Sequence, residues 1–463
     1  MTNFAFPPNW EKVELSDIAI FQNGYAFKSS TYSDAGDFVI RIGNVQDTGI
    51  NLNNPAYVNA TKLNVEKFRL SKDDILMSLT GNVGRTAIIK EEHLPAVLNQ
   101  RVARVIFSSL MEGKFNFYLL RSSIVQSDLL KCAKGAAQLN ISTKDIDKII
   151  VGIPSIKEQK IIVEKLDTLL AQVDSTKARL EQIPQILKRF RQAVLGTALS
   201  GLLIGINKRQ HHPLCSEWQW PDIPSTWRVH KYSELVDSRL GKMLDKAKNI
   251  GSATKYLGNI NVRWFDFDLE NLQKILVSDV ERKELSLSSG DVLICEGGEP
   301  GRCAIWNELQ ETPVIFQKAL HRARVKEKII PEWLAYNLKN DSNNLSLSQL
   351  FTGTTIKHLT GKALANYPIR VPPLVEQQEI VRRVEQLFAY ADTIEKQVNN
   401  ALIRVNNLTQ SILAKAFRGE LTAQWRAENP DLISGENSAT ALLEKIKAER
   451  VASGSKKASR KKK

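Results

Sequence analysis

One segment of the chain occurs twice, and this repeat restricts what the chain can fold into. The segment IPSIKEQKIIVEKLDTLLAQVD begins at Ile153, and VPPLVEQQEIVRRVEQLFAYAD begins at Val371, 218 positions later. The same offset places Glu158 on Glu376, and it holds over the fifty residues that follow. A fixed internal period marks a repeated structural unit. Because this unit is far longer than a solenoid repeat, we infer a domain followed by a long helix, both present twice.

Both repeated segments carry a helical hydrophobic pattern. Apolar residues recur in alternating steps of four and three, a period that is typical of a left-handed coiled coil. The predicted seam residues are Ile162, Leu166, Leu169, Val173, Leu180, Ile183 and Leu187 in the first helix, and Ile380, Val384, Leu387, Ile394, Val398, Val405 and Leu408 in the second. Pro184 is expected to disturb the first helix, because a proline removes a helical hydrogen bond. The alternative is two amphipathic helices that pack on separate cores.

The length of the chain indicates how many domains it can form, and its charge indicates what kind of partner it binds. The chain has 463 residues, enough for two or more domains with hydrophobic cores. Its net charge is +14, and six of the positive charges lie between Lys456 and Lys463. A basic body with a basic tail favours a polyanionic partner such as nucleic acid. A surface that is charged only for solubility would give the same balance.

The cysteines and the apolar runs indicate a cytosolic protein. No apolar run approaches the length of a membrane span, and no signal peptide opens the sequence. None of the cysteines forms a CxxC pair, so we interpret all of them as reduced thiols without a zinc site. They are Cys132, Cys215, Cys295 and Cys303.

Ahead of each repeated segment, short β-type runs alternate with turns rich in Gly, Asn and Asp, and a helical stretch follows. This pattern predicts α+β domains with a strand-rich core and helices beside it. The two copies share few residues outside the helices, as expected for a protein that reads two different things. The predicted parts are domains at 1–152 and 221–370, long helices at 153–203 and 371–421, a linker at 204–220, and a C-terminal extension at 422–463. Residues 453–463 are expected to be disordered.

Two glycine-rich turns recur at an offset of 217: Leu79–Arg85 and Glu296–Arg302. An arginine after such a turn suits a phosphate, although a hairpin turn with a solvated arginine looks the same. Amide and guanidinium side chains also alternate over 99–104 and 317–324, where they suit base edges and phosphates. Polar residues on a half-exposed strand are the alternative. The candidate DNA-binding residues are Arg41, Asn44, Arg85, Gln100, Arg101 and Arg104 in the first domain, and Lys255, Asn259, Arg263, Arg302, Gln317, Lys318 and Arg324 in the second.

No catalytic or metal-binding motif is recognisable. The sequence has no G-x-x-x-x-G-K-[ST] loop and no Asn-Pro-Pro-aromatic or Asp-Pro-Pro-aromatic tetrapeptide of the kind that amino-methyltransferases use. Glu281-Arg282-Lys283 matches a nuclease-like triplet only locally. His211 and His212 lie in the predicted linker, where we interpret them as solvated. The sequence therefore predicts no catalytic residue and no metal, which fits a recognition subunit better than a self-sufficient DNA enzyme.

Taken together, these features resemble the specificity subunit of type I restriction–modification enzymes. The resemblance rests on the two-copy plan, the P-x-x-W openings at Trp10 and Trp227, the Gly-x-x-Gly-Arg turns, and the I-P/P-P-x-x-E-Q starts of the long helices. It covers nearly the whole chain. The stretch Gln424–Pro430 and the helix after it resemble the enteric subgroup in particular.

The resemblance implies that each domain is a target-recognition domain that reads one half of a split, asymmetric site in double-stranded DNA. The domains would be related by a pseudo-two-fold axis, and the helices would form an antiparallel coiled coil that fixes the gap. Two modification subunits would bring S-adenosylmethionine and methylate adenine N6. Restriction subunits would add an ATP- and Mg²⁺-dependent motor and nuclease, and this chain would carry no cofactor. The alternative is a coiled-coil adaptor or scaffold whose globular domains bind proteins.

Overall fold

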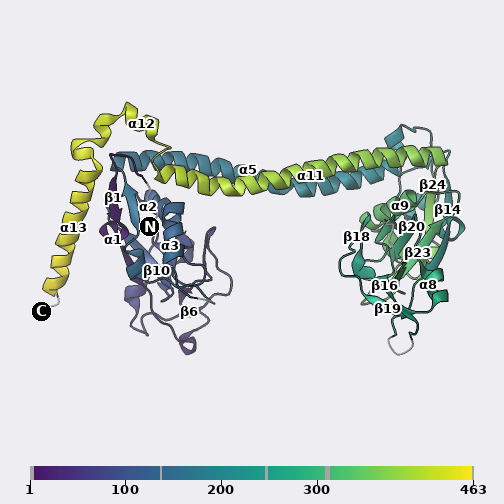
Figure 1. Ribbon diagram of the computed structural model, residues 1–463, viewed down its shortest axis with the longest axis horizontal. Helices are drawn as coiled ribbons and strands as arrows, with labels where there is room; N and C mark the ends of the chain where they lie inside the picture. Colours follow the sequence, from purple (N-terminus) through teal and green to yellow (C-terminus); the bar gives the residue numbers. More distant parts are fainter. Residues whose placement is uncertain (1–4, 136–137, 246–248, 308–312, 461–463) are drawn as a thin grey trace. The chain divides into compact units, whose positions relative to one another are not determined.

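The computed structural model describes residues 5–135, 138–245, 249–307 and 313–460 (Figure 1). The chain forms two compact units: unit 1 consists of Met1–Leu180 with Ala401–Lys463, and unit 2 consists of Glu181–Asn400. Two long helices, α5 (Ile156–Ala198) and α11 (Leu374–Phe417), each contribute to both units. Unit 1 is therefore discontinuous in sequence, whereas unit 2 is one continuous stretch.

Unit 1 contains a four-stranded antiparallel sheet, a three-stranded sheet and two short strand pairs. The larger sheet has the order β2-β10-β7-β8, and the smaller has the order β6-β3-β9, in which β3 runs parallel to β9. Strand β1 pairs with β11, and β4 pairs with β5. The strands are β1 (Glu11–Glu14), β2 (Ala19–Asn23), β3 (Asp37–Ile40), β4 (Val45–Gln46), β5 (Gly49–Ile50), β6 (Tyr57–Val58), β7 (Ile75–Ser78), β8 (Thr86–Ile88), β9 (Ala96–Leu98), β10 (Val102–Phe107) and β11 (Ile150–Ile153).

Unit 2 repeats this arrangement. Its sheets have the orders β15-β23-β20-β21 and β19-β16-β22, again with one parallel pair, β16 and β22. The strands are β12 (Arg209–Gln210), β13 (Ile223–Pro224), β14 (Arg228–Lys231), β15 (Val236–Leu240), β16 (Ser252–Leu257), β17 (Val262–Arg263), β18 (Asp266–Phe267), β19 (Lys274–Val277), β20 (Asp291–Cys295), β21 (Cys303–Trp306), β22 (Val314–Phe316), β23 (Leu320–Val325) and β24 (Pro368–Val371). The repeat in sequence is thus a repeat of fold, and the predicted α+β class is confirmed.

Short helices cover the sheets, and their apolar positions determine which face they bury. Phe115 and Leu119 of α2 lie in the core of unit 1, and Trp333 of α9 lies in the core of unit 2. Helix α9 begins at Pro331, a position where the missing N–H has no partner to lose. The shorter helices are α1 (Leu15–Ile18), α2 (Gly113–Arg121), α3 (Ser123–Cys132), α4 (Thr143–Ile146), α6 (Leu214–Glu217), α7 (Tyr232–Leu235), α8 (Asp279–Leu285), α9 (Pro331–Asn343), α10 (Gly361–Ala365), α12 (Ala423–Glu428) and α13 (Ala439–Arg460).

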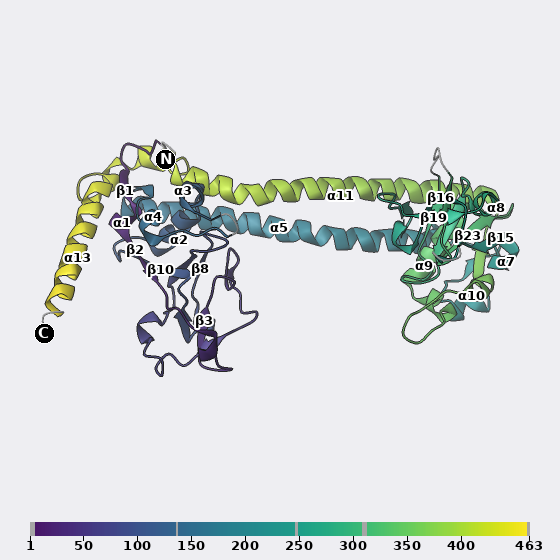
Figure 2. The same cartoon turned by 60° about the horizontal axis from the view of Figure 1, so that its bottom comes forward.

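The long helices lie side by side and run in opposite directions (Figure 1, Figure 2). In unit 1, Ile162 and Leu166 from the start of α5 share a core with Leu413 and Phe417 from the end of α11. In unit 2, the end of α5 shares a core with the start of α11 around Ile380. Arg191 of α5 also donates to Asp392 and Glu395 of α11, at 2.6 and 2.8 Å. The pairing of the two long helices is confirmed, and so is the antiparallel direction that the family resemblance implies.

The prediction that Leu408 lies in the buried seam of the coiled coil is wrong. Leu408 is 44% exposed, while Val405, Leu413 and Phe417 are buried. An α-helix drifts by about 20° per heptad from a strict 3.5-residue repeat. At this end α11 packs on the core of unit 1 as well as on α5, so its buried face turns away from Leu408. In the described ranges, no helix is both long enough and apolar enough to cross a membrane.

The stretch predicted as a polar linker is instead packed into unit 2. Trp218 and Trp220 are buried in its core, and Trp220 Nε1 donates to Asp341 at 3.1 Å. Asp341 also accepts from Tyr367 Oη at 2.8 Å and from Arg370 Nη2 at 3.3 Å. Burial raises the pKa of Asp341, while the Arg370 charge opposes this change. The two charges satisfy each other in the interior and fasten 204–220 to the second domain.

The C-terminal extension belongs to unit 1. Leu442 and Ile446 of α13 lie in the same core as α1 and β1, beside which α13 runs (Figure 2). Arg450 donates to the carbonyl oxygens of Ser16 and Ala19. Helix α13 continues to Arg460, so the prediction that 453–460 lack regular structure is wrong, and 461–463 lie outside the described residues.

The recurring Glu-Gln pair explains how each domain is joined to its helix. Gln159 Nε2 donates to Pro154 O at 3.0 Å, and its Oε1 accepts from Glu112 N at 3.0 Å. Gln377 makes the equivalent bonds, to Pro372 O at 2.9 Å and from Ile330 N at 3.1 Å. Each glutamine therefore ties the first turn of a long helix to its own domain.

Candidate functional site

In unit 1, separate loops meet at one edge of the domain. Leu79 N donates to Arg101 O at 2.9 Å, which joins the glycine-rich turn to the turn at 99–101. Gly81 N donates to Leu139 O at 2.7 Å, which adds the loop at 134–140. A fourth loop, 41–46, joins through a hydrogen bond from Arg85 Nη1 to Gln46 Oε1 at 2.5 Å. We call these four loops the loop edge of unit 1.

Unit 2 assembles the same loop edge from 258–263, 296–302, 317–319 and 352–358. Glu296 N donates to Ala319 O at 2.9 Å, and Leu359 N donates to Glu296 O at 2.7 Å. Asn259 Nδ2 donates to Gly297 O at 3.0 Å. The two loop edges are therefore equivalent in construction.

The glycines of the two turns are required by geometry. Gly84 and Gly301 have φ values of 88° and 90°, in the left-handed region that side chains disfavour. A Cβ at Gly84 would lie 2.6 Å from Gln126 Oε1, and one at Gly301 would lie 2.4 Å from Leu347 Cδ2. The turns can approach α3 in unit 1 and Leu347 in unit 2 only without a side chain.

Five of the predicted DNA-binding residues are exposed. Gln100 and Arg101 lie on the loop edge of unit 1, and Lys318 and Arg263 lie on that of unit 2. Arg263 Nη2 also donates to Asp268 at 3.3 Å. Lys255 is exposed too, but it lies on β16 opposite Lys274 of β19 and not on a loop of the edge.

Four other predicted residues hold the loop edges together. Arg302 donates to Glu299 Oε2 at 3.0 Å and to Asn259 O at 2.9 Å. Arg85 binds Gln46 as described above, and Arg41 Nη2 donates to the carbonyl oxygen of Asn54 at 2.5 Å. These residues and Gln317, whose backbone N–H donates to Leu257 O at 2.9 Å, are half-buried. They shape the surface that a ligand would meet.

The residue of unit 2 that corresponds to Asn44 is Asn261, which was not among the predicted residues. Asn44 is 3% exposed; its Oδ1 accepts from Arg41 N at 3.0 Å and its Nδ2 donates to Asn51 O at 2.8 Å. In unit 2 these bonds are made by Asn261, from Gly258 N at 2.9 Å and to Asp268 O at 3.0 Å. Asn44 and Asn261 therefore close the loop, and Asn44 is too deeply buried to reach a base.

Arg104 and Arg324 are also not equivalent. Arg104 lies opposite Leu76 in the sheet, and the residue opposite the matching Leu293 is Arg322. Arg322 is buried and donates to Glu284 O at 3.0 Å, and burial lowers its pKa.

Arg104 and Arg324 each bind a carboxylate inside the domain. Arg104 Nη1 lies 3.1 Å from Asp74 Oδ2, and Arg324 Nε lies 2.7 Å from Asp291 Oδ1. The bond to Asp291 raises the pKa of Arg324. Both arginines are thus held as structural ion pairs.

The loops at 134–140 and 352–358 were missed by the sequence comparison. Each is closed by a bridge, between Lys134 and Asn140 in unit 1 and between Thr352 and His358 in unit 2. A Cβ at Gly135 or at Gly353 would lie 2.2 Å from the carbonyl oxygen three residues later. These glycines are 218 positions apart, the one signal that could have revealed the pair. Residues 136–137 lie outside the described residues.

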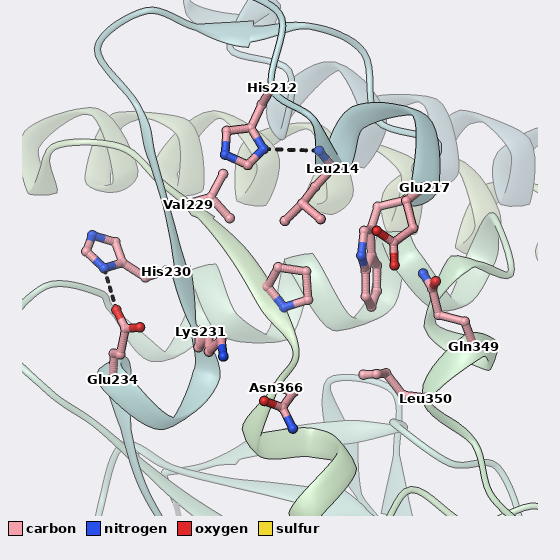
Figure 3. Close-up of a pocket in the computed structure, with 12 residues that line it drawn as sticks. His212, Leu214, Glu217, Val229, His230, Lys231, Glu234, Gln349, Leu350 and Asn366 are labelled. Atoms are coloured by element: carbon pink, nitrogen blue, oxygen red, sulfur yellow. Dashed lines mark hydrogen bonds and ion pairs between the residues drawn. The ribbon is translucent and has the colours of Figure 1, made fainter.

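A pocket of about 530 Å³ lies on another face of unit 2 (Figure 3). Leu214 and Val229 line its apolar part, while His230 and Glu234 point toward one another at its rim, 2.9 Å apart. This hydrogen bond lowers the pKa of Glu234. Since the pocket is built from the 204–220 stretch, β14, α7 and β24, it is distinct from the loop edge.

Three possible metal ligands also converge in unit 2. The side chains of His211, Cys215 and Asp222 place one donor atom each within 4.8 Å of one another. Spacing along the sequence did not reveal this group, because Asp222 is brought back by the β12–β13 pair. His211 Nδ1 lies 2.9 Å from Asp222 Oδ1, so these two groups satisfy each other. The four cysteines are free thiols.

Two copies of one α+β domain, each with exposed basic side chains at a loop edge, define a protein with two recognition domains. The family described as "Type I restriction modification DNA specificity domain" matches residues 7–185 and 224–404, and the chain belongs to this family. It is a type I restriction enzyme specificity subunit, and the adaptor alternative is not favoured.

Named relatives agree over nearly the whole length. The chain is 40% identical to the type I restriction enzyme EcoKI specificity subunit of Escherichia coli K12, covering 98% of each chain. It is 41% identical to the EcoBI specificity subunit of Escherichia coli, covering 98% of this chain and 95% of the relative. The fold is similar to the crystal structure of the HsdS subunit from Thermoanaerobacter tengcongensis, with a TM-score of 0.59, 19% identity, and coverage of 90% and 99% of the two chains.

Proposed function

We propose that the chain reads a two-part, asymmetric site in double-stranded DNA, with one unit on each half-site. The supporting observation is that one loop edge recurs in both units with different exposed side chains. Gln100 and Arg101 of unit 1 correspond to Lys318 and Ala319 of unit 2 at the offset of 218. Because the two loop edges share a backbone arrangement but expose different side chains, we expect them to bind two different half-sites. The target is then not palindromic.

The side chains at the edges suit the two kinds of contact that a DNA reader needs. Lysine and arginine side chains bind phosphates and make affinity depend on salt, while amide and guanidinium groups can pair with base edges. A good bidentate pair gives about 1–3 kcal/mol of discrimination. Of the predicted residues, we assign direct contacts to Gln100, Arg101, Arg263 and Lys318, because they are exposed on the edges.

We assign the chemistry of the complex to other subunits. Two modification subunits supply S-adenosylmethionine and methylate adenine N6, and restriction subunits supply the ATP- and Mg²⁺-dependent motor and nuclease. This chain makes no bond and carries no cofactor, and the complex acts in the cytoplasm. Docking falls on the long helices, which expose large apolar side chains that water disfavours: Ile186, Val375, Tyr390 and Ile403.

Exchanging one domain tests the half-site assignment. Residues 1–152 are replaced by the corresponding part of a related specificity subunit, and methylation is mapped across the genome of a host that carries the modification subunits. We expect one half-site to change completely while the other keeps its sequence, because each loop edge is built within one unit. A change in both half-sites, or in neither, would contradict the proposal.

Lengthening the helices tests whether they set the gap. One heptad is inserted into α5 and one into α11, which keeps the seam in register. Seven residues add about 10 Å of helix at about 1.5 Å per residue, or roughly three base pairs at about 3.4 Å each. We expect the gap to grow by about that much with both half-sites unchanged, as read by methylation of a library of spaced targets. An unchanged gap would sink the idea that the helices act as a spacer.

A further inference from the structure

Two isoleucines stand out of the loop edge of unit 2. Ile260 is 71% exposed in the short 3₁₀ turn Asn259–Asn261, and Ile356 is 65% exposed in the loop at 352–358. Single exposed apolar residues are ordinary on protein surfaces. Two β-branched side chains on neighbouring loops of one recognition edge are a different matter, because both add apolar surface where the ligand is expected.

The backbone places these two loops on either side of Gly297. Asn259, next to Ile260, donates its Nδ2 to Gly297 O at 3.0 Å. A Cβ at Gly297 would lie 3.2 Å from Nδ1 of His358, at the end of the other loop. The glycine turn is thus the common support from which both isoleucines project.

The loop edge that carries the isoleucines also carries basic residues, whereas unit 1 has a different chemistry at the same places. Arg263, Lys318 and Lys357 are exposed on the loops 258–263, 317–319 and 352–358. In unit 1 the equivalents of Ile260 and Ile356 are Gly43 and Gln138. Leu139, which is 36% exposed, takes the position of Lys357. The combination of two apolar tips within a basic rim is therefore specific to unit 2.

We propose that Ile260 and Ile356 read the C5-methyl group of thymine in the half-site bound by unit 2. That methyl group is the apolar feature of the major groove, and an apolar side chain beside it distinguishes thymine from cytosine without a hydrogen bond. The basic residues around the tips hold the flanking phosphates. The inference rests on the proposed function, since it needs unit 2 to read DNA.

Deoxyuridine provides the test, because it is thymidine without the methyl group. After the target is known from methylation mapping, the complex of this chain with its modification subunits is titrated with duplexes in which each thymine of one half-site is replaced in turn. In the half-site of unit 2, at least one replacement is expected to weaken binding about fourfold, equivalent to about 0.8 kcal/mol for one methyl group. In I260A and I356A variants, the replaced and natural duplexes should bind alike.

Matched controls separate this inference from the function on which it rests. Val280→Ala removes an equally exposed apolar side chain from α8, outside the loop edge, and should leave the fourfold effect intact. The isoleucine variants should not change the response to deoxyuridine in the other half-site. Sequence-specific binding with no deoxyuridine effect, or an effect that survives both isoleucine variants, overturns the inference alone. If the wild-type complex bound all duplexes equally, whatever their sequence, the proposed function would be overturned.

Discussion

Replacing Asp341 by alanine is expected to lower the free energy of unfolding of unit 2 by about 3–5 kcal/mol. Asp341 and Arg370 are 0% and 1% exposed, so the substitution leaves a guanidinium in the interior without its counter-charge. It also removes the acceptor of Trp220 Nε1 and Tyr367 Oη. Hydrogen exchange of the β24 and α9 amides reports on unit 2 alone and is the measurement of choice.

Asp279→Ala is the control for this experiment. Asp279 belongs to the same unit, but its side chain is 92% exposed, so we expect a change of about 0.5 kcal/mol or less. Unit 1 should exchange at its wild-type rate in both variants. If Asp341→Ala shifted the protection of unit 2 by less than about 1 kcal/mol, the buried ion pair would not be what fastens the 204–220 stretch.

Glu158→Ala is expected to destabilise unit 1 by about 3 kcal/mol, while the equivalent Glu376→Ala costs unit 2 about 1 kcal/mol. Buried Glu158 accepts from Arg426 Nη1 at 2.6 Å and from Thr422 Oγ1 at 2.7 Å, so its loss leaves a half-buried cation unpaired. Half-buried Glu376 accepts a neutral hydrogen bond from Trp227 Nε1 at 2.8 Å. The two positions are therefore internal controls for one another.

Limited proteolysis and exchange of the α12 and α13 amides would measure the first effect. In Glu158→Ala, α12 should become susceptible well before the sheets of unit 1 do, because Arg426 anchors it to the start of α5. Helix α13 should be affected less, because Arg450 still binds the carbonyl oxygens of Ser16 and Ala19. Equal losses in the two variants would show that the Arg426 contact contributes nothing beyond an ordinary hydrogen bond.

The repeat and the paired helices could be predicted from the sequence because a long period is a strong signal. Most of the predicted seam is buried or half-buried, from Ile162 to Leu187 and from Ile380 to Val405. The failure at Leu408 lies where α11 packs on the core of unit 1 as well as on α5. The hydrophobic period predicts which face of a helix packs on a partner helix. It cannot show where the core of a domain also packs on that helix and changes which face is buried.

The details of the loop edge were harder to predict. The candidate residues were selected by their type, whereas the equivalent positions of the two domains follow from the alignment of their strands. The offset is 217 up to the glycine turn and 218 from β10 onward. At these offsets Asn44 corresponds to Asn261 and Arg104 to Arg322, neither of which was among the predicted residues of the second domain. The glycine turns were located correctly because Gly84 and Gly301 have positive φ values, which favour glycine over residues with a side chain.

The stretch at 204–220 was misjudged for a related reason. Its proline and polar residues are typical of a linker, yet Trp218 and Trp220 bury large rings. Asp341, which accepts the hydrogen bond of Trp220, is 121 residues away from it, and the sequence gives no indication of that contact. A buried ion pair reads as two ordinary surface charges until the fold is known.

The division of the chain between the units also sets the order in which they can be completed during synthesis. Unit 2 is one stretch of 220 residues, Glu181–Asn400, and its Lys326 Nζ donates to Ser233 O at 3.3 Å. In unit 1 the equivalent carbonyl, that of Ser16, receives its hydrogen bond from Arg450 near the end of the chain. Helix α13 ends at Arg460, 280 residues after Leu180. At about 5–20 residues per second, the first-made domain waits roughly 14–56 s for this last helix, while the second closes on itself. A chain that stops between Asn400 and Ala439 thus leaves the ribosome with unit 2 complete and unit 1 without its last helix.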